Sequence, residues 1–292
     1  MFECVGLNKT NFNKLLDLNK LRHNFNNLNE DFIKVYNNSN FAQRMLLRRR
    51  VKLLIKDSRY IGYIWAEMND KKNCSIKALN VLSSNNADIL DYSPYKALIN
   101  NLRKNTLVNY YCESNNFNSQ ILENIGFTQG EGTLILGLNV EENKLVMPEH
   151  SLQFETLQVG ADEGKRCRIQ NEIFKNNNRL PLTIDDIYFD EAQSYYLDKG
   201  AVFLKKDGQY VGYGQIIIEE NTPVIVNFGI LKEHRGKGYS KVFLSYLLKV
   251  IKDAGFDFVK IKVKNTNNIA LNLYKRVGFQ VIGEIYNWEL KR

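Results

Sequence analysis

The feature that most constrains this chain is a strand, a glycine-rich loop and a helix that follow one another between Val224 and Gly255. Val224–Leu231 is an apolar run with β-branched residues, which is typical of a buried strand. Apolar residues then recur at helical spacing from Phe243 to Ile251, and Gly255 stands where a helix C-cap glycine belongs. The sequence therefore predicts a loop held between the end of a strand and the start of a helix.

This loop reads Arg235-Gly-Lys-Gly-Tyr-Ser240, a composition that favours phosphate binding. Glycines let the backbone approach a ligand closely, and the N-terminus of a helix attracts negative charge. The NTPase phosphate loop is excluded because no Gly-x-x-x-x-Gly-Lys-Ser/Thr run is present. The dinucleotide fingerprint does not fit, because Lys241 replaces its third glycine and Asp257 precedes the next strand, Phe258–Val263, instead of ending it.

A third pattern fits the loop. Arg-x-x-Gly-x-Gly/Ala, with the small Ser240 at its last position, resembles the coenzyme A pyrophosphate loop of the GNAT superfamily of acyltransferases. Downstream, the sequence is similar to the second GNAT signature, Asn-x-x-Ala-x-x-Leu-Tyr-x-x-x-Gly-Phe, at Asn267, Ala270, Leu273, Tyr274, Gly278 and Phe279. The two motifs stand in the expected order, separated by one helix and one strand, and the pair is far more specific than either motif alone.

The resemblance implies an enzyme that transfers an acetyl group from acetyl-CoA to an amine by direct attack on the thioester. In the family, a backbone N–H of the strand before the loop stabilises the carbonyl oxygen, which corresponds here to Phe228–Ile230. Tyr274 matches the residue that returns a proton to the coenzyme A thiolate. The coenzyme-binding residues implied in this way are Phe228, Gly229, Ile230, Arg235, Gly236, Lys237, Gly238, Tyr239, Ser240, Lys241 and Asn267.

These roles have structural alternatives. Tyr274 has helical spacing with Leu271 and Val277, which also suits a core-facing aromatic residue. Glu219 and Glu220 end the strand beside the active-site strand and could accept the amine's proton, although a solvated strand end explains them more simply. The general base is therefore left open.

An acidic stretch lies where the loops that bind the acceptor usually sit in the family; it holds Asp185, Asp186, Asp190 and Glu191. The alternative interpretation of this stretch is an exposed acidic helix with no role in acceptor binding. His234 adjoins the glycine loop, where we expect it to pack and not to transfer protons.

An internal repeat divides the chain. Tyr60-Ile-Gly-Tyr63 matches Tyr210-Val-Gly-Tyr213, and Ile125-Gly-Phe127 matches Val277-Gly-Phe279, each pair about 150 residues apart. We expect an α+β fold of two tandem GNAT-like domains, each a mixed, mostly antiparallel sheet flanked by helices. The predicted domains are residues 1–145 and 146–292, and the C-terminal domain is expected to end in a pair of strands around 280–290.

The N-terminal half looks degenerate. Its counterpart of the glycine loop, Ser83–Tyr95, contains no glycine and no arginine, and Asp88 and Asp91 would repel a pyrophosphate. Leu122 stands at the place of Tyr274. We expect this half to lack coenzyme A binding and to keep the fold for packing or for shaping the acceptor site.

Composition narrows the class of protein. The 292-residue chain has no apolar run of eighteen residues and no signal peptide, so we expect a cytoplasmic protein without membrane contact. Its net charge is +8, yet no nucleic-acid module accompanies the basic cluster at 44–56, which a solvated sheet edge would explain. The four cysteines and three histidines are too scattered for a metal site, so we expect none.

We therefore expect a cytoplasmic N-acetyltransferase that uses acetyl-CoA, with an amine-bearing small molecule or protein as acceptor and no nucleic-acid partner. The alternative from another class is a non-catalytic coenzyme A-binding regulatory or interaction module. A third interpretation is a nucleic-acid-binding protein with a vestigial loop. Asn267 and Tyr274 favour the enzyme, because a binding module needs no proton donor. The sequence does not identify the acceptor, the acyl-chain preference or the oligomeric state.

Overall fold

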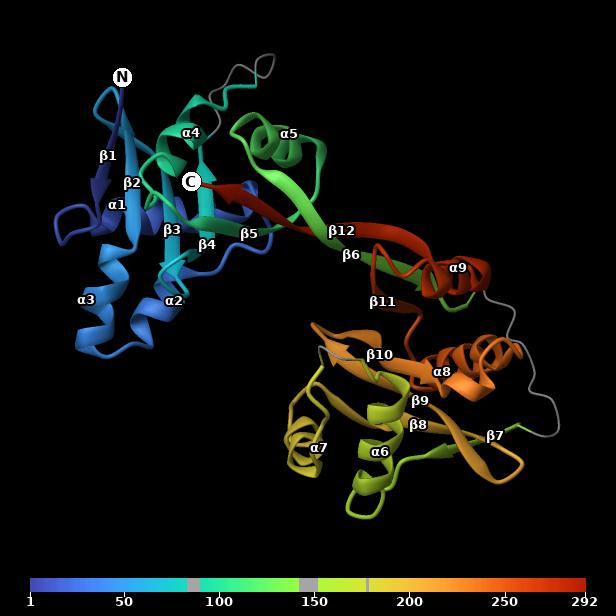
Figure 1. The fold of residues 1–292 in the computed structure, drawn as a ribbon. Helices are drawn as coiled ribbons and strands as arrows, with labels where there is room; N and C mark the ends of the chain where they lie inside the picture. The colour runs from blue at the N-terminus through green and yellow to red at the C-terminus, as the bar shows by residue number, and fades with distance from the viewer. Residues whose placement is uncertain (83–89, 142–151, 177–178) are drawn as a thin grey trace. The chain divides into compact units, whose positions relative to one another are not determined.

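The computed structural model of the chain describes residues 1–82, 90–141, 152–176 and 179–292. The chain forms two compact units, each an α+β arrangement of helices on a sheet (Figure 1). Unit 1 comprises Met1–Gly132 together with Gly283–Arg292, and unit 2 comprises Thr133–Ile282.

Unit 1 is built on strands in the order β1-β2-β3-β4-β5-β12, which are antiparallel except for the parallel pair β4 and β5. The strands are β1 (Phe2–Gly6), β2 (Val51–Lys56), β3 (Arg59–Met68), β4 (Asn73–Val81), β5 (Leu107–Glu113) and β12 (Gln280–Lys291). The helices are α1 (Phe12–Lys20), α2 (Phe32–Asn37), α3 (Phe41–Arg49), α4 (Ser93–Ile99) and α5 (Asn116–Asn124), with the 3-10 turn η1 (Arg22–Asn24).

Alternation along the strands of unit 1 supplies a core on each face of the sheet. Leu53 and Tyr63 are fully buried in a cluster with residues of α1, α2 and α3. Their neighbours Leu54 and Ile64 turn to the other face and pack with residues of α4 and α5. The unit is therefore a three-layer structure whose sheet is buried on both sides.

Unit 2 repeats this plan with strands in the order β6-β11-β10-β9-β8-β7, of which only β10 and β11 are parallel among the described pairs. The strands are β6 (Thr128–Asn139), β7 (Leu152–Thr156), β8 (Tyr196–Lys206), β9 (Gln209–Glu219), β10 (Thr222–Ile230) and β11 (Phe258–Lys264). The helices are α6 (Glu163–Ile173), α7 (Ile184–Glu191), α8 (Tyr239–Asp253) and α9 (Asn268–Val277), with the 3-10 turn η2 (Lys232–His234).

The sheet of unit 2 is also covered on both faces. Val202 and Leu204 pack with the apolar stripe of α8, whereas Phe203 and Tyr213 pack with α6. The hairpin between β8 and β9 turns at Asp207-Gly208, where both residues have positive φ, at 50° and 78°. This is the two-residue turn that the Asp-Gly pair favours.

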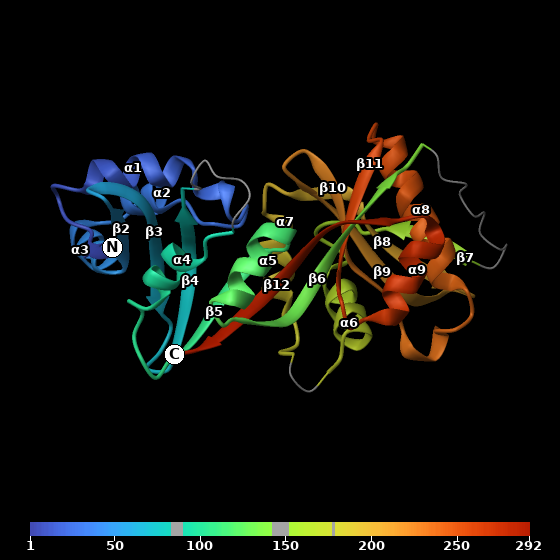
Figure 2. The same ribbon diagram turned by 90° about the horizontal axis from the view of Figure 1, so that it is seen from above.

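Each unit is completed by a strand from the other half of the sequence. In unit 1, β12 pairs with β5 from Ile285↔Glu113 to Lys291↔Leu107 (Figure 2). In unit 2, β6 pairs with β11 from Thr133↔Lys264 to Asn139↔Phe258. The compact units are therefore bounded differently from the division at residue 145 that the sequence suggested, because strand pairing and not chain order decides where these two segments pack.

The α+β class and the mixed, mostly antiparallel sheets are confirmed. The expected pair of closing strands is wrong, because the segment forms the single strand β12. The basic cluster does not lie on a sheet edge: Arg44, Arg48 and Arg49 are on α3, and β2 lies inside the sheet between β1 and β3. Residues 142–151 of the predicted junction and residues 83–89, the first part of the predicted loop Ser83–Tyr95, lie outside the described residues.

The four cysteines are free thiols, and three of them are buried. Among the described residues, no helix is long and apolar enough to cross a membrane.

The exchange of strands predicts that a residue near the C-terminus stabilises unit 1. Trp288 on β12 is 0% exposed and belongs to the core beneath α4 and α5. We expect Trp288→Ala to lower the free energy of unfolding of unit 1 by about 3–5 kcal/mol, as for other buried Trp truncations. Urea denaturation followed by the fluorescence of Trp65, which lies in the same unit, measures this loss. Lys291→Ala, at an exposed position of β12 in the same unit, is the matched control and should change stability little. Equal stability of the two variants would contradict the prediction.

Candidate functional site

The predicted glycine loop connects β10 and η2 to the start of α8. Gly236 and Gly238 have φ of 76° and 82°, the left-handed region that favours glycine. Gly238 is the N-cap of α8, so no side chain caps the helix, and no acidic residue lies in its first turn. A Cβ at either glycine would meet no described atom within 4 Å. The first N–H groups of this fifteen-residue helix are therefore suited to an anion such as a pyrophosphate.

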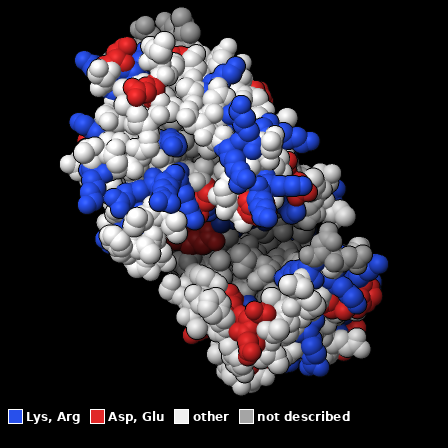
Figure 3. Space-filling view, turned by 60° about the vertical axis from the view of Figure 1, so that its left-hand side comes forward, with Lys and Arg blue, Asp and Glu red and all other residues white. Residues whose placement is uncertain are grey.

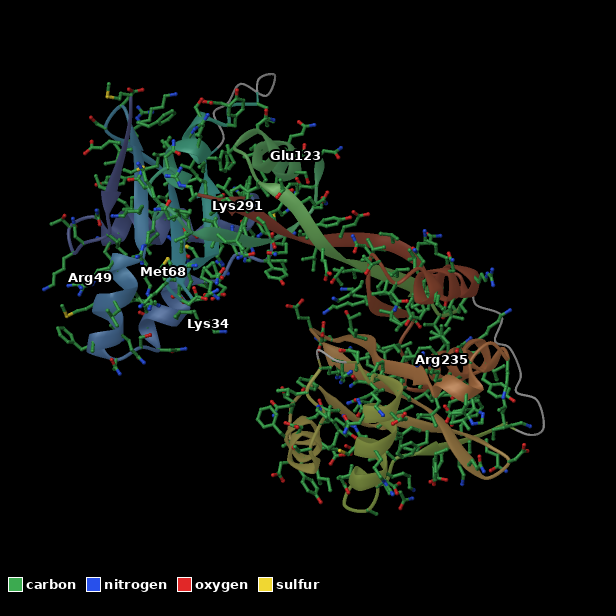
Figure 4. All side chains as sticks on the ribbon, viewed as in Figure 1. Lys34, Arg49, Met68, Glu123, Arg235 and Lys291 are labelled. Atoms are coloured by element: carbon green, nitrogen blue, oxygen red, sulfur yellow. The ribbon has the colours of Figure 1, made fainter. Side chains whose placement is uncertain are left out.

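Arg235 is exposed, but its guanidinium turns back toward the ends of β10 and α6. Its Nε donates to the carbonyl of Ile230 at 2.8 Å, and its Nη2 donates to that of Ile173, the last residue of α6, at 3.0 Å. Figure 4 shows Arg235 beside β10 and α8. Its guanidinium thus ties the loop to the end of β10 and to the C-terminus of α6. The exposed Lys237 and Lys241 are the loop lysines that remain free to meet an anion from solvent.

Strand β10 separates from β11 before it reaches the loop. It pairs with β11 only at Val224 and Ile225 in the described register, whereas its pairing with β9 continues to Ile230. The register on β9 shifts between Val226 and Gly229, and Asn227 within this bulge has a φ of 50°. The last residues of β10 therefore present one strand edge without a β11 partner, where an extended group can hydrogen-bond to the backbone.

Phe228 and Gly229 follow the bulge and face opposite sides of the sheet. The Phe228 ring lies 5.4 Å from that of Phe243 on α8, between centroids. A Cβ on Gly229 would overlap Cγ2 of Ile173 on α6. The packing of α6 therefore requires glycine at position 229. The sequence pattern alone does not predict this requirement.

Tyr274 lies on α9 and faces the core of unit 2. Its ring is 6.4 Å from Phe228 and 6.0 Å from Phe279, between centroids, and the residue is 6% exposed. Burial raises the pKa of Tyr274 to about 12. The hydroxyl therefore stays protonated at neutral pH, as a proton donor must, and the side chain is also a core aromatic.

Asn267, the other residue of the second motif, is the N-cap of α9. Its Oδ1 accepts a hydrogen bond from the N–H of Ala270 at 3.2 Å, and the residue is exposed. The cap uses the carbonyl oxygen of the side chain, so the amide nitrogen of the same side chain can donate a hydrogen bond to another group. Asn267 thus has a structural role that does not conflict with a coenzyme contact.

A buried polar network lies on the α6 face of β9 and β10. Arg166 of α6 has a side chain that is 2% exposed, and its Nη2 donates to Asp190 and, at 3.0 Å, to Oε1 of Gln215. Gln215 in turn donates to Asp190 at 3.0 Å and accepts from Nδ2 of Asn227 at 3.1 Å. Tyr195 donates to Asp190 at 2.8 Å. The network therefore connects α6 and α7 directly to the bulge of β10.

The two carboxylates at the end of α7 differ in their surroundings. Burial opposes ionisation of Asp190, but hydrogen bonds from Arg166, Gln215 and Tyr195 lower its pKa below the usual value. Burial, reinforced by the charge of Glu163, raises the pKa of Glu191. The Glu191 side chain is 6% exposed, its Oε1 lies 3.5 Å from Nη1 of Arg166, and neither of its oxygens accepts a hydrogen bond from the described residues. Glu191 is thus a buried carboxylate whose pKa is raised even though it faces the guanidinium of Arg166.

The sequence singled out other acidic groups that the structure places at the surface. Glu219 forms an ion pair with Lys262 at 2.7 Å, with both side chains about 40% exposed, and Glu220 begins the turn between β9 and β10. Asp186 caps the start of α7 through Thr183. His234 lies in η2 and is half-buried. None of these residues joins the buried network in the described part of the chain.

Unit 1 holds a counterpart of the opening between β10 and β11, and a segment of its own chain fills it. Parallel pairing of β4 and β5 runs from Asn73↔Leu107 to Ile76↔Tyr110. Beyond these pairs, Asn29 donates to the carbonyl of Leu79 at 2.9 Å and accepts from its N–H at 3.2 Å. On the β5 side, Asn26 donates to the carbonyl of Tyr111 at 2.8 Å and accepts from the N–H of Glu113 at 3.1 Å.

The same segment, residues 25–30, is buried between the two strands. Asn26 and Asn29 are 2% and 3% exposed, and Phe25 is 1% exposed. The Phe25 ring lies 4.8 Å from that of Tyr95 and 6.4 Å from that of Tyr110, between centroids. The backbone groups of β4 and β5 that a ligand would bind in this opening are therefore already paired within the protein.

On the face seen in Figure 3, Lys and Arg form the larger groups, and Asp and Glu lie between them. The described residues contain no cluster of His, Cys, Asp and Glu suited to a metal ion.

Part of unit 2 and the fold of the whole chain are similar to known proteins. Residues 168–279 match the Acetyltransferase (GNAT) family. The chain is 29% identical to an N-alpha-acetyltransferase of Sulfurisphaera tokodaii over 144 residues, which cover 42% of this chain and 85% of the relative. It is 25% identical to a mycothiol acetyltransferase of Streptomyces griseus over 137 residues, and this alignment spans 46% of the chain and only 44% of the relative.

A solved tandem GNAT protein from the clavulanic acid biosynthesis pathway has the same fold, with a TM-score of 0.56 and 10% sequence identity, over 99% of this chain and 98% of that one. Residues 168–279, which include the glycine loop and most of unit 2, thus match the GNAT family, and the chain as a whole shares the fold of a tandem GNAT protein.

The packing at Gly229 gives a prediction that is independent of the coenzyme. Because a Cβ there would overlap Ile173, we expect Gly229→Ala to displace the end of α6 and destabilise unit 2 by about 1–3 kcal/mol. The melting temperature followed by circular dichroism measures the change. Gly229→Ala combined with Ile173→Ala should be less destabilised than the sum of the two single variants. Strict additivity would show that the overlap is not the cause.

Proposed function

We propose that this chain is an acetyl-CoA-dependent N-acetyltransferase with its coenzyme site in unit 2. One observation carries the proposal: the uncapped start of α8, behind two left-handed glycines, adjoins the unpaired edge of β10. The helix start suits the pyrophosphate, and the strand edge suits the extended pantetheine arm. The family match to residues 168–279 includes both of these elements.

The bound cosubstrate supplies an activated acetyl group, and the protein supplies orientation and proton transfers. The amine nitrogen forms a bond to the thioester carbonyl carbon, and the C–S bond then breaks. A backbone N–H near the bulge of β10, in the region 228–230, would donate to the carbonyl oxygen as it gains negative charge. Tyr274, packed against Phe228, would hydrogen-bond to the departing sulfur and protonate it.

Glu191 is the described carboxylate that best fits the proton acceptor for the amine. It is buried, its oxygens accept no hydrogen bond from the described residues, and its network leads through Arg166 and Gln215 to Asn227. A raised pKa brings a carboxylate nearer to the working pH, where it accepts protons most effectively. Because several hydrogen bonds separate Glu191 from the bulge, we propose that a water molecule carries the proton between them.

We propose one coenzyme per chain. Residues 25–30 fill the opening in unit 1, and Leu122 occupies the position that corresponds to Tyr274. Unit 1 would then act as a folded partner that supports unit 2 or contributes to acceptor recognition. The acceptor is proposed as an amine of a small molecule or a protein, the class that the name of the N-alpha-acetyltransferase relative suggests.

Calorimetric titration with acetyl-CoA tests the coenzyme site. We expect one binding event per chain in the wild type and none in Gly238→Glu, because a carboxylate at the start of α8 would repel the pyrophosphate. Gly208→Glu is the matched control, since Gly208 is also a left-handed glycine with no neighbour within 4 Å but lies in the β8–β9 turn. Two equivalent sites would refute the proposal for unit 1, and no binding would refute the proposal for unit 2.

The role of Tyr274 is tested by Tyr274→Phe. We expect the turnover number to fall by about 100-fold or more through loss of the proton donor, with little change in the Kd of coenzyme A. Release of free thiol in the presence of a panel of primary amines measures turnover. Tyr246→Phe, at another packed tyrosine of unit 2, should keep wild-type rates. Unchanged turnover in Tyr274→Phe would leave the residue with a packing role only, and binding without turnover in the wild type would favour the non-catalytic module.

Glu191 predicts a specific pH dependence. The base must be ionised to accept a proton, so a raised pKa makes kcat/KM for the amine fall as the pH is lowered through that value. In Glu191→Gln we expect a lower kcat/KM and loss of this acidic limb. Glu219→Gln should preserve both the rate and the limb, because Glu219 is paired with Lys262 at the surface. An acidic limb that persists in Glu191→Gln would assign the base elsewhere.

A further inference from the structure

Asn227 has an unusual backbone for its place in the fold. Among the described non-glycine residues with positive φ, Asn227 is the one that lies inside a strand. The others lie in turns or loops, for example Asp207 in the β8–β9 hairpin. A left-handed residue costs free energy, although less for asparagine than for most residues, and such strain persists only where the surroundings enforce it.

Gln215 is the group that holds the backbone of Asn227 at positive φ. It is 0% exposed, lies on β9 opposite Val226, and accepts the hydrogen bond from Nδ2 of Asn227 at 3.1 Å. The orientation of the Gln215 amide is itself fixed, because Arg166 donates to its oxygen and Asp190 accepts from its nitrogen. With its oxygen so directed, Gln215 can pair only with a donor, and Asn227 must present its amide nitrogen.

This arrangement links the bulge to a rigid, buried anchor. Arg166 has a 2% exposed side chain and is held by Asp190 and by Gln170, which accepts from its Nε at 3.0 Å. Arg166 also lies over the ring of Tyr213 at 5.5 Å. Movement of Asn227 would therefore break its hydrogen bond to Gln215, because the Gln215 side chain is held in place by Arg166 and Asp190.

We propose that Gln215 and Asn227 are positioning residues for the carbonyl-binding backbone of β10, with Arg166 and Asp190 as their anchor. The inference rests on the proposed function, because it assumes that the residues after the bulge meet the thioester oxygen. Their side chains need not touch the cosubstrate. They hold the bulge so that the next N–H groups of the strand point at a fixed place.

The test compares acetyl-CoA with free coenzyme A and needs no acceptor. The two ligands differ only in the acetyl group, which a thiol hydrogen replaces in coenzyme A, so a change in the ratio of their Kd values reports the surroundings of that group. We expect Gln215→Met to raise the Kd of acetyl-CoA by about threefold to tenfold, the effect of roughly one hydrogen bond, and to leave the Kd of coenzyme A unchanged. Gln209→Met, at an exposed position of the same strand, is the matched control.

Asn227 provides a second route that does not disturb the buried anchor. Asn227→Gly removes the side-chain bond but still permits positive φ, whereas Asn227→Ala removes the bond and also disfavours the left-handed backbone. We expect the selective loss of acetyl-CoA affinity to be larger in Asn227→Ala than in Asn227→Gly. The infrared carbonyl stretch of bound, carbon-13-labelled acetyl-CoA should move toward its value in solution in the same order.

The outcomes separate this proposal from the proposed function. Failure of the wild type to bind either ligand would contradict the coenzyme site itself. Binding of both ligands by the wild type, with all three variants folded and their affinity ratio and carbonyl stretch unchanged, would overturn the positioning role alone. Equal weakening of both ligands in Asn227→Gly and Asn227→Ala would also overturn it, because that result describes a general structural defect.

Discussion

The structure of unit 2 depends on how briefly β10 and β11 pair. Two residues hold the strands together as parallel neighbours, and the bulge at Asn227 then turns the rest of β10 toward β9 alone. Backbone polar groups inside a protein must find partners, so an unpaired strand edge in the middle of a sheet is costly unless something occupies it. An extended ligand with amide groups of its own would satisfy this requirement, and for this reason we propose that the opening and the glycine loop form one site.

Unit 1 meets the same requirement in another way. Asn26 and Asn29 each use both ends of a side-chain amide to pair with the backbone of β5 and of β4. Phe25 adds apolar burial among aromatic residues. Both units have two parallel strands that diverge and leave backbone groups unpaired. An internal segment pairs with these groups in unit 1, and we propose that a diffusing cosubstrate does so in unit 2. In this proposal, unit 1 retains the sheet without retaining the ligand.

Much of the fold and part of the candidate site were predictable from the sequence, because local sequence patterns specify them. The loop at 235–240 and the helix Asn268–Val277 follow from glycine positions and apolar spacing, and both lie where they were expected. Three contacts join residues more than forty positions apart: the hydrogen bond from Arg235 to Ile173, the packing of Ile173 on Gly229 and the hydrogen bond from Arg166 to Gln215. No local pattern encodes such contacts. Glu191 could have been separated from its acidic neighbours only by knowing which side of α7 faces α6.

The crossed strands β6 and β12 have a consequence for how the two halves can exist apart. A fragment that ended at residue 145 would lose the strand that covers β5, and it would carry the exposed length of β6 that normally pairs with β11. The complementary fragment would lack a neighbour for β11 and would carry the apolar β12 unpaired. Open strand edges of this kind are sites of association. The halves of this protein are therefore expected to be inherited, expressed and folded together, and separated fragments would tend to recombine through the same two strands.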